Sequence, residues 1–345
     1  MIYKIIINKD AKLKEALLKL DANPEMQTLF IEDDNKIVGT ITDGDIRRGL
    51  INGLGNDSSL SDFMNRNFTY LVKGKYEKEK IDFIKKNKFE TVPVLNLDKS
   101  LFRIINFKKV KTILPIDAVI MAGGTGSRLM PLTKNTPKPM LKIGDKPIME
   151  YNVDLLKRFG ISNLTLSVNY LAEIIEDYYK DGAHKGINIS YITEKEPLGT
   201  IGAVKQIHHF HNNYILVMNS DLLTNINLEA MFNELVSNNA DMIIATTDYK
   251  VQIPYGIVET NNNQITALVE KPVYTYYSNA GIYIFKKEMI DLIPVNTHFN
   301  ATDLLEKGIS LNKKIRHYSI KSYWLDIGKH DDFEKAQKDI KTIRF

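Results

Sequence analysis

The segment that most constrains the fold of this chain runs from Val119 to Leu129, with the sequence Val-Ile-Met-Ala-Gly-Gly-Thr-Gly-Ser-Arg-Leu. It begins in an apolar run that is typical of a buried strand and continues into a turn with three glycines and Arg128. Lys138 follows within Thr-Pro-Lys-Pro. Glycines let backbone N–H groups approach an anion closely, and fixed cations neutralise its charge. The segment therefore predicts a buried strand that leads into a phosphate-binding loop.

The spacing of these glycines excludes two common phosphate-binding loops. A P-loop requires Gly-x-x-x-x-Gly-Lys-Ser/Thr, and the chain has no such sequence. A dinucleotide fingerprint requires a third glycine at the position of Leu129. The loop therefore belongs to another kind of nucleotide site.

The chain divides into two predicted units at a linker, residues 113–116, where a charged stretch ends just after Pro115. Beyond it, apolar runs typical of strands alternate with amphipathic stretches, such as residues 148–159, which suit a helix that ends at Gly160. This alternation predicts an α/β unit over residues 117–345, with a Rossmann-like, mainly parallel sheet. Ligands of such sheets bind at the carboxyl ends of the strands.

The first unit, residues 1–112, contains a weak internal repeat. Residues 28–42 and 91–105 each have the pattern strand, polar turn, strand, and each follows an amphipathic stretch typical of a helix. With Thr42-x-x-Asp45, this resembles a small α+β pair of cystathionine-β-synthase (CBS) domains. The resemblance implies that Thr42 and Asp45 bind the ribose of an adenine nucleotide. Ligand sensing and oligomerisation alone both stay open, because a fold does not establish binding.

Composition excludes several other classes of protein. No apolar run approaches the roughly 20 residues of a membrane span, and the N-terminus has no secretory signal pattern. The chain has no cysteine, which excludes disulfides and thiolate metal sites. Its net charge of +4 derives from residues 1–115, but their basic residues lack the clustered aromatics of a nucleic-acid surface. We expect a cytoplasmic protein that binds neither membrane nor nucleic acid.

Short motifs of the second unit resemble, in the right order, those of the sugar-1-phosphate nucleotidyltransferases, and most closely mannose-1-phosphate guanylyltransferases. They are the glycine loop with Pro-Lys138-Pro, Glu194 with Leu198-Gly-Thr-Ile-Gly-Ala203, the strand that ends in Asp221, Tyr255-Gly256, Glu270-Lys-Pro272, Asn279-Ala-Gly-Ile-Tyr283 and Trp324-Leu-Asp-Ile-Gly328. The resemblance covers nearly the whole second unit. It implies an enzyme that transfers a nucleotidyl group from a nucleoside triphosphate to a sugar 1-phosphate and releases pyrophosphate.

The resemblance also assigns residues to roles. The nucleotide is expected to contact Ala122, Gly123, Gly124, Thr125, Gly126, Ser127, Arg128, Lys138, Glu194, Gly199 and Thr200. The sugar phosphate is expected to contact Tyr255, Gly256, Glu270, Lys271, Asn279 and Gly281. Asp221 and Asp326 are expected to hold Mg²⁺, which takes one or two carboxylates together with phosphate oxygens. The expected catalytic residues are Arg128, Lys138, Asp221, Lys271 and Asp326.

These residues fit an in-line attack of the sugar phosphate on the α-phosphorus. The nucleophile is already anionic, since the second pKa of a phosphate monoester is about 6. No general base is needed, so catalysis reduces to positioning and charge neutralisation. Because no general base is needed, we expect the histidines of 208–211 to lie at a surface or at a helix end. We expect Trp324 to pack beside Asp326. The tyrosines of 274–277 are either a lid over the sugar or an ordinary loop.

The base and the sugar are less constrained. Glu194 can accept hydrogen bonds from both N1–H and N2–H of guanine, which favours GTP, with UTP as the next candidate. The fusion to a CBS pair resembles bacterial enzymes of surface-glycan synthesis, so glucosamine 1-phosphate is the first expectation, with mannose and heptose 1-phosphates open. A homo-oligomer is expected by the same resemblance. The alternative of another class is a non-catalytic nucleotide-binding regulator.

Overall fold

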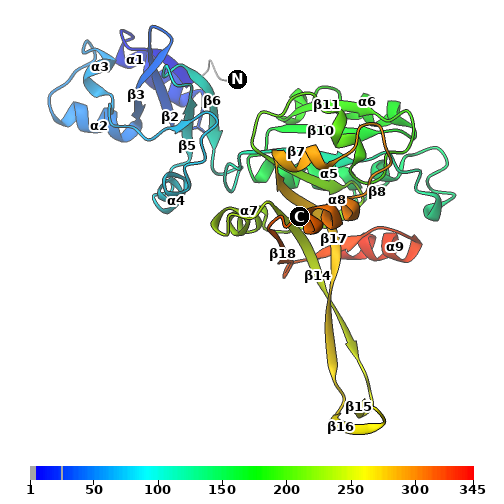
Figure 1. Ribbon diagram of the computed structural model, residues 1–345. Helices are drawn as coiled ribbons and strands as arrows, with labels where there is room; N and C mark the ends of the chain where they lie inside the picture. The colour runs from blue at the N-terminus through cyan, green and yellow to red at the C-terminus, as the bar shows by residue number, and fades with distance from the viewer. Residues whose placement is uncertain (1–4, 25) are drawn as a thin grey trace. The chain divides into compact units, whose positions relative to one another are not determined.

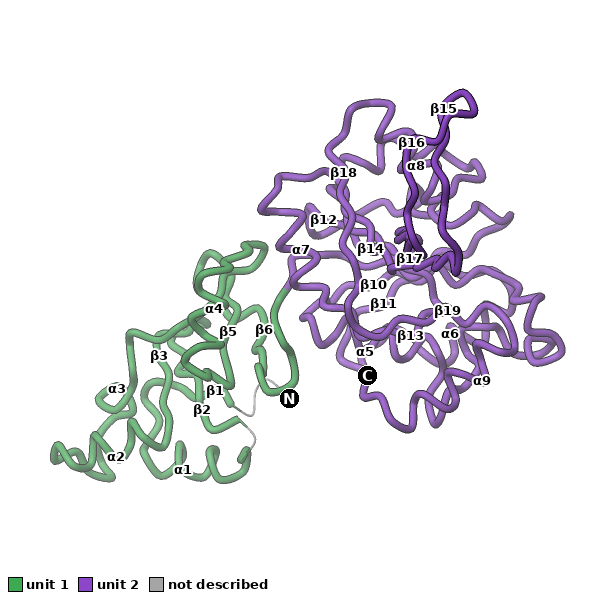
Figure 2. Tube along the Cα trace, turned by 90° about the horizontal axis from the view of Figure 1, so that it is seen from below, with its two compact units in different colours: residues 1–113 green, residues 114–345 purple. Residues whose placement is uncertain are grey.

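The computed structural model describes residues 5–24 and 26–345, which separate into two compact units with the division between Ile113 and Leu114 (Figures 1 and 2). No helix in the described part of the chain combines the length and apolar character that a membrane span requires.

The first unit consists of two similar halves. The first half contains β1 (Ile6–Asn8), α1 (Leu13–Asp21), β2 (Thr28–Asp33), β3 (Lys36–Thr42), α2 (Asp43–Ile51) and α3 (Leu60–Phe63). The second contains β4 (Leu71–Val72), α4 (Lys78–Lys86), β5 (Thr91–Leu95) and β6 (Leu101–Asn106). In each half a three-stranded sheet pairs its first strand parallel and its third antiparallel to the middle strand. The weak repeat in the sequence is therefore a structural repeat.

The second unit is built on a seven-stranded sheet in the order β11-β10-β7-β12-β17-β14-β18. Its strands are β7 (Ile116–Met121), β10 (Asn163–Val168), β11 (Asn188–Thr193), β12 (Tyr214–Asn219), β14 (Met242–Gln252), β17 (Val273–Lys286) and β18 (Ile315–Ser319). All neighbours are parallel except where β17 pairs with β12 and β14. The prediction of a mainly parallel sheet is confirmed.

Helices and short sheets surround this sheet. The helices are α5 (Ile148–Arg158), α6 (Ala172–Tyr179), α7 (Leu228–Ser237), α8 (Ala301–Ser310) and α9 (His330–Asp339). The short strand pairs are β8 (Lys142–Ile143) with β9 (Lys146–Pro147), and β13 (Leu222–Thr224) with β19 (Trp324–Asp326). The central strands are apolar on both faces because both are covered: all of β7 except Met121 is buried.

One hairpin leaves the body of the second unit. Strands β14 and β17 pair from Met242–Phe285 out to Gln252–Val273, with a register shift between Ile244 and Thr246, and the ribbon continues into β15 (Ile257–Asn261) and β16 (Gln264–Val269). Figure 1 shows it projecting far from the sheet, with β15 and β16 at its tip. We call residues 247–278 the arm. Nearly all of its side chains are exposed.

Candidate active site

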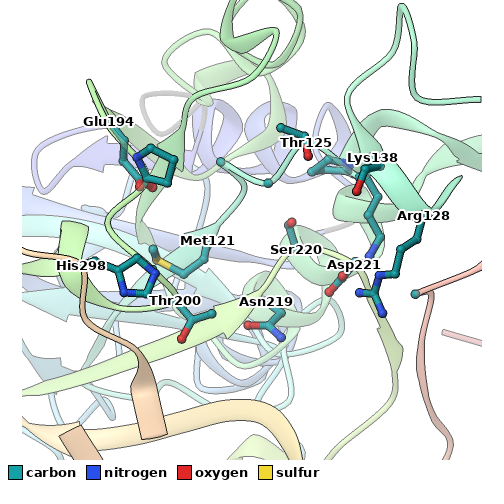
Figure 3. Close-up of a pocket in the computed structure, with 18 residues that line it drawn as sticks. Met121, Thr125, Arg128, Lys138, Glu194, Thr200, Asn219, Ser220, Asp221 and His298 are labelled. Atoms are coloured by element: carbon teal, nitrogen blue, oxygen red, sulfur yellow. Dashed lines mark hydrogen bonds and ion pairs between the residues drawn. The ribbon is translucent and has the colours of Figure 1, made fainter. Parts of the chain in front are cut away.

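A pocket of about 410 Å³ opens at the carboxyl ends of the parallel strands (Figure 3). Met121 at the end of β7 and Asn219 at the end of β12 lie in its wall. It is further lined by Gly123, Gly124, Thr125, Gly126, Ser127, Arg128, Lys138, Pro139, Glu194, Pro197, Gly199, Thr200, Ser220, Asp221, His298 and Gly328. The structure thus brings nearly all predicted nucleotide residues into one cavity. Ala122 is the exception: it is buried, and its N–H donates to Ser167 O.

The glycine loop owes its course to Gly126, which has φ +64. L-residues with side chains rarely adopt this conformation. A Cβ on Gly126 would also lie 2.9 Å from Lys138 Cβ and 3.0 Å from Thr133 Cγ2. Thr133 Oγ1–H donates to Gly126 O and so stabilises the turn. The glycine therefore lets the loop lie directly against Lys138.

The two predicted metal ligands, Asp221 and Asp326, come together although they are far apart in the sequence. Strands β13 and β19 pair antiparallel, with Leu222 opposite Asp326, and Ile327 N–H donates to Asp221 O. Lys138, buried beneath the loop, forms an ion pair with Asp221 Oδ2. In Figure 3, Arg128, Lys138 and Asp221 gather at one end of the pocket. This end combines two cations with two carboxylates.

The carboxylates fit a divalent cation. Asp221 Oδ1 and Asp326 Oδ1 are both buried without a hydrogen-bond partner. Burial, and then the charge of Asp221, raise the pKa of Asp326 to about 6, while Lys138 and Arg128 act in the opposite direction. The described residues contain no cluster of three or more His, Asp or Glu that could hold a metal. A cation here would therefore take the remaining ligands from substrate phosphates, as Mg²⁺ does.

Glu194 lies at the opposite end of the pocket, near His298 (Figure 3). Ser167 Oγ donates to its Oε1 at 2.6 Å, and Leu198 N–H donates to its Oε2 at 2.9 Å. Each carboxylate oxygen can accept a further hydrogen bond, since it carries two lone pairs. Glu194 therefore both orders the loop that follows it and retains acceptor capacity.

The Leu-Gly-Thr-Ile-Gly segment follows Glu194 and packs against residues 297–301. Gly199 has φ +77, and a Cβ there would lie 2.7 Å from Phe299 O. Thr200 Oγ1 accepts from Ala301 N–H at 2.9 Å. This contact places His298 in the pocket wall. Sequence reasoning missed His298, because no motif marks it and only the glycines indicate that another backbone approaches here.

None of the residues predicted to bind the sugar phosphate lines this pocket: Asn279 and Gly281 lie on β17 beside its wall, and the others lie on the arm. Gly281 allows Asn219 to approach, since a Cβ there would lie 2.6 Å from Asn219 Nδ2. Asn279 donates to Tyr283 Oη and accepts from Gly281 N–H, so it holds this bend of β17.

The other four, Tyr255, Gly256, Glu270 and Lys271, lie on the arm. They stay neighbours across the ribbon, where a Cβ on Gly256 would lie 2.9 Å from Glu270 Oε2. They do not line the pocket of their own chain, contrary to the expectation for Tyr255 and Gly256. The β14–β17 ladder, which is regular from Thr246–Asn279 to Gln252–Val273, carries them away from it. Their role in sugar binding stays a prediction.

Other residues singled out in the sequence have structural contacts. Trp324 Nε1–H donates to Ala280 O and ties β19 to β17. The rings of His209 and His211 contact each other edge to face.

In the first unit, Thr42 and Asp45 form the capping box of α2. Asp45 Oδ2 accepts from Thr42 N–H and Oγ1–H, and Asp45 Oδ1 pairs with Arg48. Both side chains therefore already stabilise the start of a helix.

Comparison with known proteins agrees with this geometry. The sequence profile of the nucleotidyl transferase family matches residues 117–343. A D-glycero-alpha-D-manno-heptose 1-phosphate guanylyltransferase of Aneurinibacillus thermoaerophilus is 35% identical over 228 residues, 65% of this chain and 98% of the relative. A UTP–glucose-1-phosphate uridylyltransferase of Synechocystis is 31% identical over 252 residues, 66% of this chain and 65% of the relative. The solved structure of HddC from Yersinia pseudotuberculosis aligns with a TM-score of 0.50 at 28% identity, covering 65% of this chain and 98% of that one.

Proposed function

The chain belongs to the nucleotidyl transferase family and is a sugar-1-phosphate nucleotidyltransferase, and we propose that it transfers a guanylyl group from GTP. The observation that carries the proposal is the polarity of the pocket. Arg128, Lys138 and Asp221 line one end, with Asp326 next to Asp221 on the paired strand β19, and the carboxylate of Glu194 lies at the other end. A nucleoside triphosphate has the same polarity, with phosphates at one end and a hydrogen-bonding base at the other.

The phosphate end supplies positioning and charge neutralisation. The planar guanidinium of Arg128 can hold two phosphate oxygens at once. Lys138 is oriented by its ion pair with Asp221 and can stabilise the charge that develops at the α-phosphate. Backbone N–H groups of the glycine loop supplement these contacts. The sugar phosphate attacks in line, and pyrophosphate carries away the electrons of the broken P–O bond.

We propose Asp221 and Asp326 as the protein ligands of Mg²⁺. The proposal is supported by their unpartnered buried oxygens and by the mutual repulsion that a cation would relieve. When bound, Mg²⁺ would neutralise phosphate charge and supplement the two cationic side chains.

We propose Glu194 as the residue that recognises guanine. Its two oxygens can accept the N1–H and N2–H of guanine while they keep their bonds to Ser167 and Leu198. Uracil offers a single N–H and cytosine a different donor pattern, so neither satisfies both oxygens. Guanylyltransferases among the relatives support this assignment.

The sugar is proposed by class: an aldose 1-phosphate, with glucosamine 1-phosphate the first candidate from the sequence. The heptose and mannose 1-phosphates in the names of the relatives are the alternatives.

The test is pyrophosphate release across GTP, UTP, CTP and dTTP, each with glucosamine, mannose, glucose and heptose 1-phosphates. We expect turnover in the GTP row and loss of turnover in Asp221→Asn. A grid without turnover, while GTP still binds, would favour the non-catalytic regulator instead.

For the first unit we propose an adenine-nucleotide sensor at Thr42 and Asp45. The capping box offers a competing structural role for the same residues. The two roles separate in Asp45→Asn, because the amide oxygen of asparagine can still accept from Thr42 N–H in the capping box, but the side chain has no charge. We expect this variant to fold normally and to lose AMP or ATP binding measured by calorimetry. Unchanged binding would contradict the proposal.

A further inference from the structure

The arm presents an unpartnered apolar surface. Tyr249 lies opposite Tyr276, and Val251 lies opposite Tyr274, so all four share one face of the ribbon. Nearer the tip, Val258, Ile265 and Leu268 are also largely exposed. From typical side-chain areas, these seven side chains offer roughly 750 Å² of exposed surface, close to the value of about 800 Å² that each partner buries in a stable interface.

A ribbon of this kind needs a partner. A two-stranded hairpin alone is marginal in water, because neither face is covered by a packing layer. Among the described residues, the ion pair, hydrogen bond and ring contact between the arm and the body lie at its base. Asp248 accepts from Ser319 Oγ and pairs with Lys321, and the ring of Tyr277 lies 4.6 Å from that of His317. The face with Tyr249 and Tyr276 is the opposite one, since residues next to each other along a strand point to opposite faces.

The arm does not reach the pocket of its own chain. Lys271 precedes Gly281 by ten residues of extended chain, which corresponds to roughly 30 Å. Gly281 touches Asn219 in the pocket wall, and a lysine side chain spans only about 6 Å. The β14–β17 register shifts at the base of the arm, between Ile244 and Thr246, and a bend there would turn the arm as one ribbon with Lys271 still roughly 30 Å from Gly281. Bringing Lys271 to the pocket of its own chain would also require breaking the ladder between Thr246–Asn279 and Gln252–Val273. A lid that closes within one chain is therefore costly.

We propose that two copies of this chain exchange their arms, so that the arm of each copy lies across the pocket of the other and brings Lys271 to its sugar phosphate. The role of Lys271 rests on the proposed function. A two-fold exchange satisfies both pockets at once, because each copy gives and receives the same arm. The exchange also covers the face formed by Tyr249, Val251, Tyr274 and Tyr276. It places Glu270 and Tyr255 beside the substrate of the other copy.

Complementation between two inactive variants tests the exchange. Asp221→Asn damages the pocket and leaves the arm intact, whereas Lys271→Ala damages the arm and leaves the pocket intact. Each alone should be nearly inactive. When the full-length variants are co-expressed, half of the dimers are mixed, and each mixed dimer has one intact pocket served by an intact arm. We expect about one quarter of wild-type activity. Activity no higher than that of the single variants overturns the proposal.

The two proposals fail in different ways. If the wild-type chain releases no pyrophosphate from any substrate pair, the proposed function is wrong. If wild type is active and the mixture is not, the exchange alone is wrong.

A second measurement does not depend on activity. The chain has no cysteine, so one engineered thiol is unique. Tyr276 and Ile309 are both 59% exposed in the single chain, and Ile309 lies on α8 far along the sequence from the arm. If the arm is covered by a second copy, iodoacetamide should alkylate Tyr276→Cys about tenfold more slowly than Ile309→Cys, because access limits the reaction. Equal alkylation rates of the two variants in the folded protein would contradict the proposed interface. As the control, the two variants should react at equal rates when unfolded in urea.

Discussion

Replacing Asp326 with asparagine should abolish activity and yet stabilise the metal-free fold at neutral pH. Burial, followed by the neighbouring Asp221, raises the pKa of the Asp326 carboxyl from 3.8 to about 6. A rise of that size corresponds to about 3 kcal/mol. Because Asp326 is only partly buried, solvent screening reduces the figure to about 1–2 kcal/mol. Asparagine has nearly the same shape and no charge, so Asp326→Asn should gain this amount in unfolding free energy.

The sign of the pH dependence follows from proton linkage. The folded state binds the Asp326 proton more tightly than the unfolded chain does, so wild-type stability falls as the pH rises from about 4 through about 6. Below this window the carboxyl is protonated in both states, and the variant has no advantage. Above it the advantage is complete. At pH 5 we expect about half of the gain seen at pH 8.

The assay is urea unfolding with a chelator present, followed by the fluorescence of Trp324. This is the only tryptophan of the chain and lies two residues from the substitution. Asp331→Asn is the matched control, because the Asp331 side chain is 86% exposed and should change stability by less than about 0.5 kcal/mol. A variant that is less stable than wild type at pH 8, or a gain that is the same at both pH values, would refute the electrostatic reasoning.

Three further substitutions test the pocket. Glu194→Gln should keep its hydrogen bonds to Ser167 and Leu198, because a serine hydroxyl can also accept, so the melting temperature should change little. We expect kcat/KM for GTP to fall about 10–100-fold while kcat/KM for UTP does not fall. Equal losses for both nucleotides would contradict base recognition by Glu194. Gly126→Ala should lose about 2–4 kcal/mol in denaturant unfolding, from positive φ and from contact with Lys138 and Thr133, and an unchanged midpoint would show that the loop relaxes freely. Arg128→Lys loses the bidentate fork, so we expect kcat/KM for GTP to fall by at least about tenfold at unchanged stability, and wild-type kinetics would exclude Arg128 from the phosphate site.

Local patterns predicted the architecture of the second unit well. Apolar runs that alternate with amphipathic stretches determine both the element types and the parallel sheet, and parallel strands end at one shared edge. The loop after β7 and Asp221 after β12 were therefore expected at the same edge, and the structure makes them neighbours because β7 and β12 are adjacent strands. The position of Asp326 next to Asp221 could not be predicted from the periodicity of apolar residues. It depends on the pairing of β13 with β19, two three-residue strands too short to be recognised from pattern, and only the family motif indicated it.

His298 shows the limit of reading motifs in isolation. Gly199 indicates that another backbone approaches closely, but nothing in the sequence says which one. The structure identifies it as residues 297–301, whose carbonyls occupy the space that side chains at Gly199 and Gly202 would fill. A glycine can thus reveal a close contact in the sequence while its partner stays unknown until the chain is folded.

The arm illustrates a different limit. Glu270-Lys-Pro272 indicates a chemical role, but the position of that chemistry is set by how far β14 and β17 stay paired. The alternation of Tyr249 and Val251 on one strand, and of Tyr274 and Tyr276 on the other, is equally compatible with a strand in a sheet and with a free ribbon. The register shows that these side chains share one face, and their exposure shows that no layer of the same chain covers it. Residues assigned to a pocket by their motif can therefore lie about 30 Å away on the same chain, and a symmetric second copy is what would bring them back to a pocket.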